Sequence, residues 1–235
     1  MRLRRILAAV VVTTLAAPAA LLTSPTTASA ATATQIVGGT DGKGWIYRSS
    51  SYASQPGAPV FGDTFSLSIN VVAGSSQVYD GTLTVQRQLP GKDWKTIKTS
   101  SSAYLYDSIK AVGNANYRVL YSGSGDYAPS SAGVSSQVQR KLDYSNVGGR
   151  TVVLAGKVSP KYKGKIAIFK QQGKKWKKFK TIKSNRKGKF RTPLPAPRSG
   201  RYYFKIEIPA SRAFAKTQSG KFYTYSVRAS ARGSI

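Results

Sequence analysis

The chain of 235 residues contains no cysteine and no histidine, and only eight of its residues are acidic. Without cysteine, no disulfide can link the strands and no lipid-modified cysteine can tether an exported chain. Without imidazole or thiolate groups, the common nucleophile–base pairs and ordinary zinc or haem ligation are excluded. These absences leave carboxylates as the main candidates for catalysis or metal binding.

The few acidic residues do not form a catalytic or metal-binding pattern. Asp63, Asp80 and Asp126 adjoin glycines in predicted turns, where a carboxylate usually bonds its own backbone. Beyond residue 140 the only acids are Asp143 and Glu207, and alternation along its strand places Glu207 on the solvent side. Two-carboxylate hydrolysis and calcium loops both need clustered acids. The sequence therefore predicts a protein that is not an enzyme and has no cofactor or metal.

The N-terminus has the pattern of an export signal. Arg2, Arg4 and Arg5 precede a mostly apolar run, which ends near Ala28-Ser29-Ala30. A positive start, an apolar middle and an A-x-A-like end are typical of a cleaved secretory signal peptide. We therefore expect residues 1–30 to be a signal peptide. The mature protein is expected to be secreted and extracellular, with cell-wall association as an option.

Positive charge is concentrated in the second half of the mature chain. Residues 31–140 hold nine Lys or Arg and six Asp, a formal charge of +3. Residues 141–235 hold 25 Lys or Arg and two acids, a formal charge of +23. A one-sided excess of this size bears on binding partners rather than on the fold.

A period of two and an internal repeat indicate the fold. Residues 65–71 alternate apolar and polar side chains, as a half-buried strand does. Residues 80–99 and 163–183 read as the same hairpin, with eight identities over seventeen compared positions when Gly81 is set against Gly164. Short strands with turn residues between them favour β-sandwiches. We predict an all-β protein with a flexible lead-in at 31–58 that could include one short strand at 45–48, a first sandwich at 59–140, a linker at 141–148 and a second, basic sandwich at 149–235.

The second strand of each hairpin contains a conflict of parity. Trp176 and Phe179 cannot both face inward on a regular strand, and the same holds for Trp94 and Ile97 in the first copy. A β-bulge common to both copies resolves the conflict. We expect Trp176 to lie in the core as a large apolar side chain. The outward surface is then lysine with little aromatic interleaving, which disfavours base stacking.

The residues that frame the strands resemble a known bacterial repeat. They are Gly62-Asp63-Thr64, Gly81 to Trp94, Tyr117-Arg118-Val119 and Tyr127-Ala128-Pro129-Ser130, followed in the second copy by Gly156 to Pro160, Gly188-Lys189-Phe190 and Gly200-Arg201-Tyr202. They are similar to tandem immunoglobulin-like or fibronectin-III-like repeats of secreted actinomycete proteins, a family of uncertain role. The resemblance implies two immunoglobulin-like domains in tandem and supplies no catalytic residues.

The excess of lysine predicts a polyanionic partner. We expect the second sandwich to bind anionic envelope polymers, acidic polysaccharide, non-specific nucleic acid or an anionic membrane surface by displacing counterions. The contact residues predicted from the sequence are Lys174, Lys175, Lys177, Lys178, Lys180, Lys183, Arg186, Lys187 and Lys189.

Three alternatives remain open at this point. The lysines could form a merely solvated surface and block strand-to-strand aggregation. A protein partner, not identified by the sequence, could bind the first sandwich around Tyr104 and Tyr106, in which case the basic surface serves solubility only. A carbohydrate could stack on exposed aromatics of the lead-in, namely Trp45, Tyr47 and Tyr52.

Overall fold

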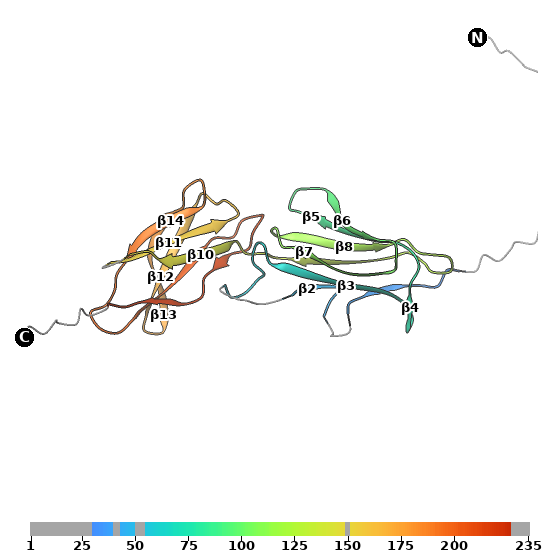
Figure 1. Cartoon of the computed structure of the whole chain (residues 1–235), viewed down its shortest axis with the longest axis horizontal. Coiled ribbons are helices and arrows are strands. Elements are labelled where there is room, and N and C mark those ends of the chain that lie inside the picture. The colour runs from blue at the N-terminus through green and yellow to red at the C-terminus, as the bar shows by residue number, and fades with distance from the viewer. Residues whose placement is uncertain (1–29, 40–42, 50–54, 149–150, 227–235) are drawn as a thin grey trace, which may run out of the picture. The chain divides into compact units, whose positions relative to one another are not determined.

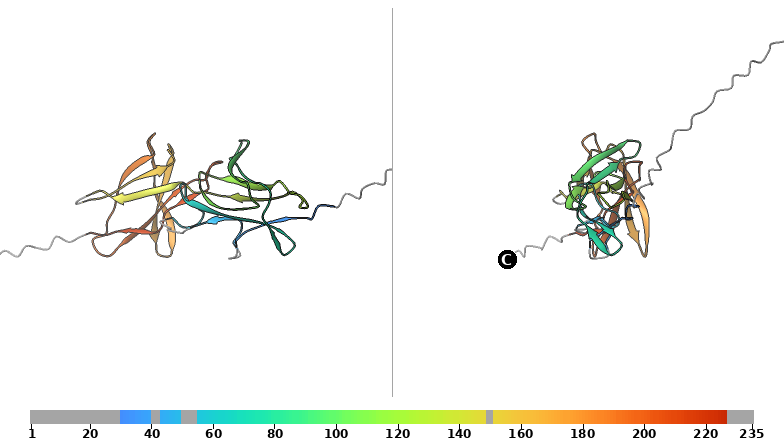
Figure 2. Two further views of the ribbon diagram at one scale, coloured as in Figure 1. Left: turned by 45° about the vertical axis from the view of Figure 1, so that its right-hand side comes forward. Right: turned by 90° about the vertical axis from the view of Figure 1, so that its right-hand side faces the viewer.

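The computed structural model describes residues 30–39, 43–49, 55–148 and 151–226 (Figure 1). Every regular element in these residues is a β-strand, and the layers can be followed from two further sides in Figure 2. No helix in the described part of the chain could span a membrane. The predicted signal peptide lies outside the described residues, apart from its last position.

The strands before residue 137 form two antiparallel sheets. One sheet is centred on β3 (Thr64–Ala73), which pairs with β1 (Gln35–Val37), β2 (Ile46–Arg48), β4 (Ser76–Val78) and β7 (Tyr104–Lys110). The other has the order β6-β5-β8-β9, with bounds Trp94–Ser100, Leu83–Gln88, Ala115–Tyr121 and Ser130–Ser136. Alternation on β3 turns Phe65, Leu67 and Ile69 into one core, which also includes Leu83 and Val85 of β5.

The strands after residue 140 repeat this pattern around a second core. One sheet has the order β10-β11-β14, with bounds Lys141–Asn146, Val152–Ser159 and Lys189–Leu194. The other has the order β13-β12-β15-β16, with β17 also paired to β15; the bounds are Lys175–Lys183, Lys165–Gln172, Tyr202–Ile208, Thr217–Gln218 and Phe222–Thr224. Leu154 of β11 and Ile166, Ile168, Phe204 and Ile206 of the other sheet are buried together. Two facing sheets around each core are consistent with β-sandwich packing.

Two segments differ from the sequence expectation. Residues 141–146, expected as a linker, form β10 and pair with β11 from Lys141↔Ser159 to Asn146↔Leu154. In the expected flexible lead-in, β1 is a strand that the sequence did not predict, whereas β2 falls on the short strand considered at 45–48. Both pair with β3, and Trp45 belongs to the first core. Each of these strands is short, so it has too few residues to show a clear period. The pairing with a long neighbouring strand is what orders it.

The β-bulge expected in both hairpins is confirmed. The register of β5 and β6 shifts between Val85 and Gln86, which leaves Ile97 without an opposite residue. The register of β12 and β13 shifts between Ile168 and Phe169, which leaves Phe179 in the equivalent position. The two copies therefore share the bulge as well as the sequence repeat.

The expected core position of Trp176 is wrong. Trp176 pairs with Gln171, whose side of the strand is that of Phe169, opposite to the buried Ile166 and Ile168. The bulge instead turns Phe179 towards the core side, where its ring lies edge-on against Phe204 at a centroid distance of 5.9 Å. In the first copy the equivalent Ile97 packs against its core and Trp94 does not, whereas Phe179 remains 40% exposed.

Candidate polyanion-binding surface

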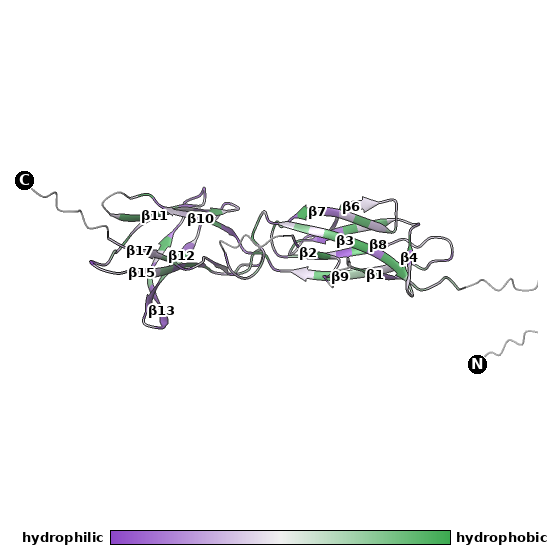
Figure 3. Ribbon diagram, turned by 60° about the horizontal axis from the view of Figure 1, so that its bottom comes forward, coloured by the Kyte–Doolittle hydropathy of each residue, from purple (hydrophilic) through white to green (hydrophobic). Residues whose placement is uncertain are grey.

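The nine candidate residues do not lie on one surface. Eight of them are exposed, and Lys180 is half-buried. They are distributed over the hydrophilic strand β13 (Figure 3), the turns on either side of it and the start of β14. The candidate residues therefore lie on several faces of residues 141–226, which we call the basic region.

Lys178 and Lys180 point to opposite sides of β13 because the bulge lies between them. Lys178 pairs with Phe169 and so lies on the outer face of the sheet. Lys180 pairs with the buried Ile168, and its Nζ donates a hydrogen bond of 2.8 Å to the carbonyl oxygen of Pro193 on β14. Lys178 is exposed to solvent, whereas Lys180 connects the two sheets at their edge.

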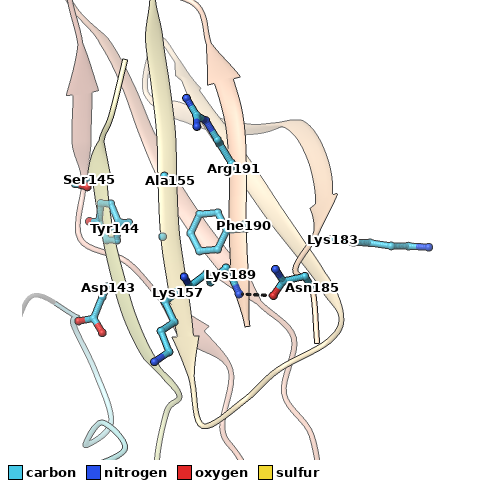
Figure 4. Close-up of a pocket in the computed structure, with 11 residues that line it drawn as sticks. Asp143, Tyr144, Ser145, Ala155, Lys157, Lys183, Asn185, Lys189, Phe190 and Arg191 are labelled. Carbon is cyan, nitrogen blue, oxygen red and sulfur yellow. Dashed lines mark hydrogen bonds between the residues drawn. The ribbon is translucent and has the colours of Figure 1, made fainter. Parts of the chain in front are cut away.

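A second basic area lies on the sheet β10-β11-β14, around a hollow of about 720 Å³ (Figure 4). Lys157 and Lys189 occupy opposite positions on β11 and β14, and Ala155 lies opposite Arg191. The hollow also has one acidic residue, Asp143, on β10. The Lys183 side chain extends away from the ring of Phe190 in Figure 4. On this face the side chains of Lys157, Lys189 and Arg191 therefore lie beside the small Ala155 and the apolar Phe190.

The outer face of the other sheet combines cations with aromatic rings. The Lys205 Nζ lies 5.2 Å from the ring centroid of Phe169 and 5.3 Å from that of Trp176. Lys178 is beside Phe169 in the register of β12 and β13. We call the face formed by Phe169, Trp176, Tyr203, Tyr223 and Tyr225, with its adjoining cations, the aromatic–cation face.

The tyrosines continue this face across β15 and β17. Tyr203 and Tyr223 are paired across the two strands, with ring centroids 6.1 Å apart. Tyr223 and Tyr225 follow at 6.0 Å. The Arg201 guanidinium lies 4.4 Å from the Tyr223 ring, and the Lys221 Nζ lies 4.7 Å from the Tyr203 ring. Each of these cations is held against a ring, which restricts its position on the surface.

Glu207 is less exposed than alternation predicts. It lies on the expected face of β15, but its side chain is only 12% exposed because Lys205 and Lys216 approach its carboxylate, each at 2.8 Å. Burial alone would raise the pKa of Glu207, but the hydrogen bonds and charges of the two lysines outweigh it and lower that pKa. Glu207 is therefore an ionised structural group rather than a candidate acid.

Few of the cations in the basic region are neutralised. Among residues 141–148 and 151–226, ion pairs with acidic groups involve only Lys141, Lys205 and Lys216. The Lys141–Asp143 pair is 3.6 Å long and both side chains are more than half exposed, so it is weak. Most of the positive charge in this region therefore faces solvent without a fixed counter-charge.

The described residues also bear on a metal-binding cluster and on the carbohydrate alternative. They contain no group of three or more His, Cys, Asp or Glu that could hold a metal ion. Of the aromatics in the carbohydrate alternative, Trp45 is 7% exposed and part of the first core, Tyr47 is half-buried, and Tyr52 lies outside the described residues.

The comparisons with known proteins identify no related family. No protein family model matches the chain, and no curated protein is similar to it in sequence.

The sequence reasoning missed the aromatic–cation face because it placed Trp176 in the core. A signal was present in the other copy. The residue equivalent to Phe179 is the aliphatic Ile97, whereas both copies have tryptophan at the other position. An aliphatic residue on a half-buried strand is the better candidate for the core side, because tryptophan and its N–H tolerate a partly solvated position.

Proposed function

We propose that this protein is a secreted, non-catalytic binding module that docks to anionic polymers of the cell envelope or its surroundings through residues 141–235. In this proposal the chain forms two tandem immunoglobulin-like β-sandwich domains after a cleaved signal peptide. The two separate hydrophobic cores support the division into two domains. The near-neutral first domain would be presented outward.

The observation that carries the proposal is the difference in charge between two regions of similar fold. Residues 31–140 form the same bulged hairpin with a net charge of +3. The fold therefore does not require the net charge of +23 that residues 141–235 have. Such an excess raises self-repulsion and attracts polyanions. Solubility alone requires a smaller charge.

A salt series on isolated Gram-positive envelopes tests the proposal. The protein is expected to bind at low salt and to elute with a steep log–log dependence on salt concentration, because each neutralised phosphate releases counterions. Reversing four exposed cations of the basic region, Lys174, Lys177, Lys178 and Lys187, to Glu should abolish retention.

A control variant changes the net charge by the same amount in the first region. It reverses the exposed Lys43, Lys92, Lys95 and Lys110 to Glu and should keep most of the retention. An equal loss of retention in both variants, or retention that does not depend on salt concentration, would contradict the proposal. Envelopes stripped of teichoic polymer, or treated with nuclease, then identify the polymer that is bound.

A protein partner is a second candidate, favoured by one observation in the first region. Tyr79, Tyr104 and Tyr106 are 63%, 41% and 64% exposed, and the last two rings are 6.3 Å apart. Exposed tyrosines of this kind are common in protein interfaces. Docking there should survive salt that abolishes binding by the basic region.

A further inference from the structure

The aromatic–cation face has a polar counterpart in the first copy. Phe169 of β12 corresponds to Gln86 of β5, since both follow the shift in register. Lys205, which pairs with Phe169, corresponds to Arg118, which pairs with Gln86. The Arg118 guanidinium lies 4.3 Å from the Trp94 ring, as Lys205 lies beside Trp176. The contact between tryptophan and cation is therefore common to both copies.

The remaining rings occur in the second copy only. Tyr203 and Tyr223 form a cross-strand pair where the first copy pairs Asn116 with Ser135. In the first copy these positions are joined by a hydrogen bond of 2.7 Å from the Ser135 hydroxyl to the Asn116 side chain. This fold can therefore form with polar side chains at the positions of Tyr203 and Tyr223. The packing of the sheet does not explain why the basic copy has rings there.

Two rings of the aromatic–cation face are exposed, and Phe169, Trp176 and Tyr203 are half-buried. Tyr223 and Tyr225 are 46% and 55% exposed, although both are large aromatic side chains at the end of the sheet. Cations adjoin the rings along the whole face, from Lys178 and Lys205 to Arg201 and Lys221. Exposed rings with cations between them fit a polymer that has both flat groups and regular negative charges.

We propose that the aromatic–cation face binds single-stranded nucleic acid without sequence specificity. This inference rests on the proposed polyanion binding and adds the chemistry of the ligand. Phosphates contact the lysines and arginines, while unpaired bases stack on the Trp176 and Tyr223 rings. In a duplex the bases are stacked on one another and the rings reach none of them, so single strands are favoured. Polymers without flat rings use the cations alone.

Two oligonucleotides of equal length separate stacking from charge. One is a thymidine oligonucleotide and the other is abasic, so both have the same phosphates. Residues 31–235, the expected mature chain, are titrated with each at the same salt concentration. The thymidine oligonucleotide should bind at least about fivefold more tightly, since stacking contributes roughly 1–3 kcal/mol per base and 1.4 kcal/mol is tenfold.

Variants assign the difference to particular rings. Trp176→Ala and Tyr223→Ala should each weaken thymidine binding by about fivefold or more and leave abasic binding unchanged. Tyr223→Phe keeps the ring and should keep the affinity. Trp94→Ala removes the equivalent tryptophan of the first copy and serves as the matched control, with no loss expected. Tyr223 is on the surface, so its variants remain informative if Trp176→Ala unfolds the protein.

The outcomes distinguish this inference from the proposed function. Equal, salt-dependent binding of both oligonucleotides would overturn the stacking inference and leave polyanion docking intact. Absence of binding to both, with no retention on envelopes, would overturn both proposals. A preference for polygalacturonate that depends on the rings, without a preference for thymidine over the abasic strand, would overturn nucleic acid in favour of an acidic sugar polymer.

Discussion

The Nζ of Lys205 lies 2.8 Å from a carboxylate oxygen of Glu207, its neighbour but one on β15. The same lysine lies beside the Phe169 and Trp176 rings. One acidic residue therefore fixes the position of a central cation on the aromatic–cation face. Lys216 holds the other carboxylate oxygen at 2.8 Å.

Replacing Glu207 should make the protein less sensitive to acid. The pKa of Glu207 is lowered in the folded state, so its stabilisation is complete above the unfolded value near 4.5 and is lost as pH falls through the folded pKa. We expect Glu207→Gln to lower the free energy of unfolding at pH 7 by about 1–2 kcal/mol. The difference from wild type should shrink below pH 4.5.

Urea unfolding between pH 7 and 3 measures this difference as a function of pH. Asp143→Asn removes the other acid of the basic region, whose pair with Lys141 is long and exposed, and should leave stability unchanged. A constant difference between Glu207→Gln and wild type over the whole range would show that the charge of Glu207 does not contribute.

Lys178 and Lys180 should differ in binding although each variant removes one charge. Lys178→Ala is expected to weaken binding to the thymidine oligonucleotide and to reduce the salt slope by about 0.7, the contribution of one phosphate contact on a single strand. Lys180→Ala should leave the slope nearly unchanged. It should instead destabilise the protein by roughly 0.5–1 kcal/mol, because the Pro193 carbonyl loses its donor. Equal effects on the slope would show that the two lysines share one face.

Tyr121 should stabilise the protein through a hydrogen bond of its hydroxyl group, whereas the exposed Tyr79 should not. The Tyr121 hydroxyl donates to the Asp80 carbonyl oxygen at 2.8 Å, and its ring fills the space beside Gly81, where a Cβ would lie 2.4 Å from it. Tyr121→Phe should therefore cost about 1 kcal/mol in urea unfolding. Tyr79→Phe is the control, since Tyr79 is 63% exposed, and should cost nothing measurable. Identical losses would mean that the bond to Asp80 adds no stability.

The layered all-β architecture and the shared bulge were predictable because both depend on local pattern. The alternation of residues 65–71 and the repeat of Gly81 and Gly164 are visible in the sequence and correspond to paired strands. The conflict between Trp176 and Phe179 correctly indicated an irregularity in the ladder. Local pattern did not say which of the two aromatic residues faces the core, since that depends on which residue of the strand the bulge skips.

The candidate surface was less predictable for the same reason. Lys178 and Lys180 have the same parity in the sequence, yet the bulge places them on opposite sides of the sheet. Short strands such as β10 became visible only through their partners, because Leu142 and Tyr144 are too few apolar residues to define a period. The prediction of a polyanionic partner depends on net charge, while register determines which cations and rings share a face.

The buried Gln139 side chain bonds three backbone groups in two other segments, so its replacement should lower stability. Its side chain is only 2% exposed. The Nε2 donates to the carbonyl oxygens of Pro56 and Ala58 at 2.7 and 3.0 Å, and the Oε1 accepts from the Gln218 N–H at 2.9 Å. A leucine of similar size would leave all three backbone groups without a partner.

We therefore expect Gln139→Leu to lower the free energy of unfolding by about 2–4 kcal/mol, since each unsatisfied buried group costs roughly 1–3 kcal/mol. The exposed Gln137 provides the control, and Gln137→Leu should change stability by no more than about 0.5 kcal/mol. Amide hydrogen exchange adds a local measurement, because the Gln218 N–H should lose protection in the Gln139 variant. If that amide stays protected and stability is unchanged, the Gln139 side chain does not connect these segments in solution.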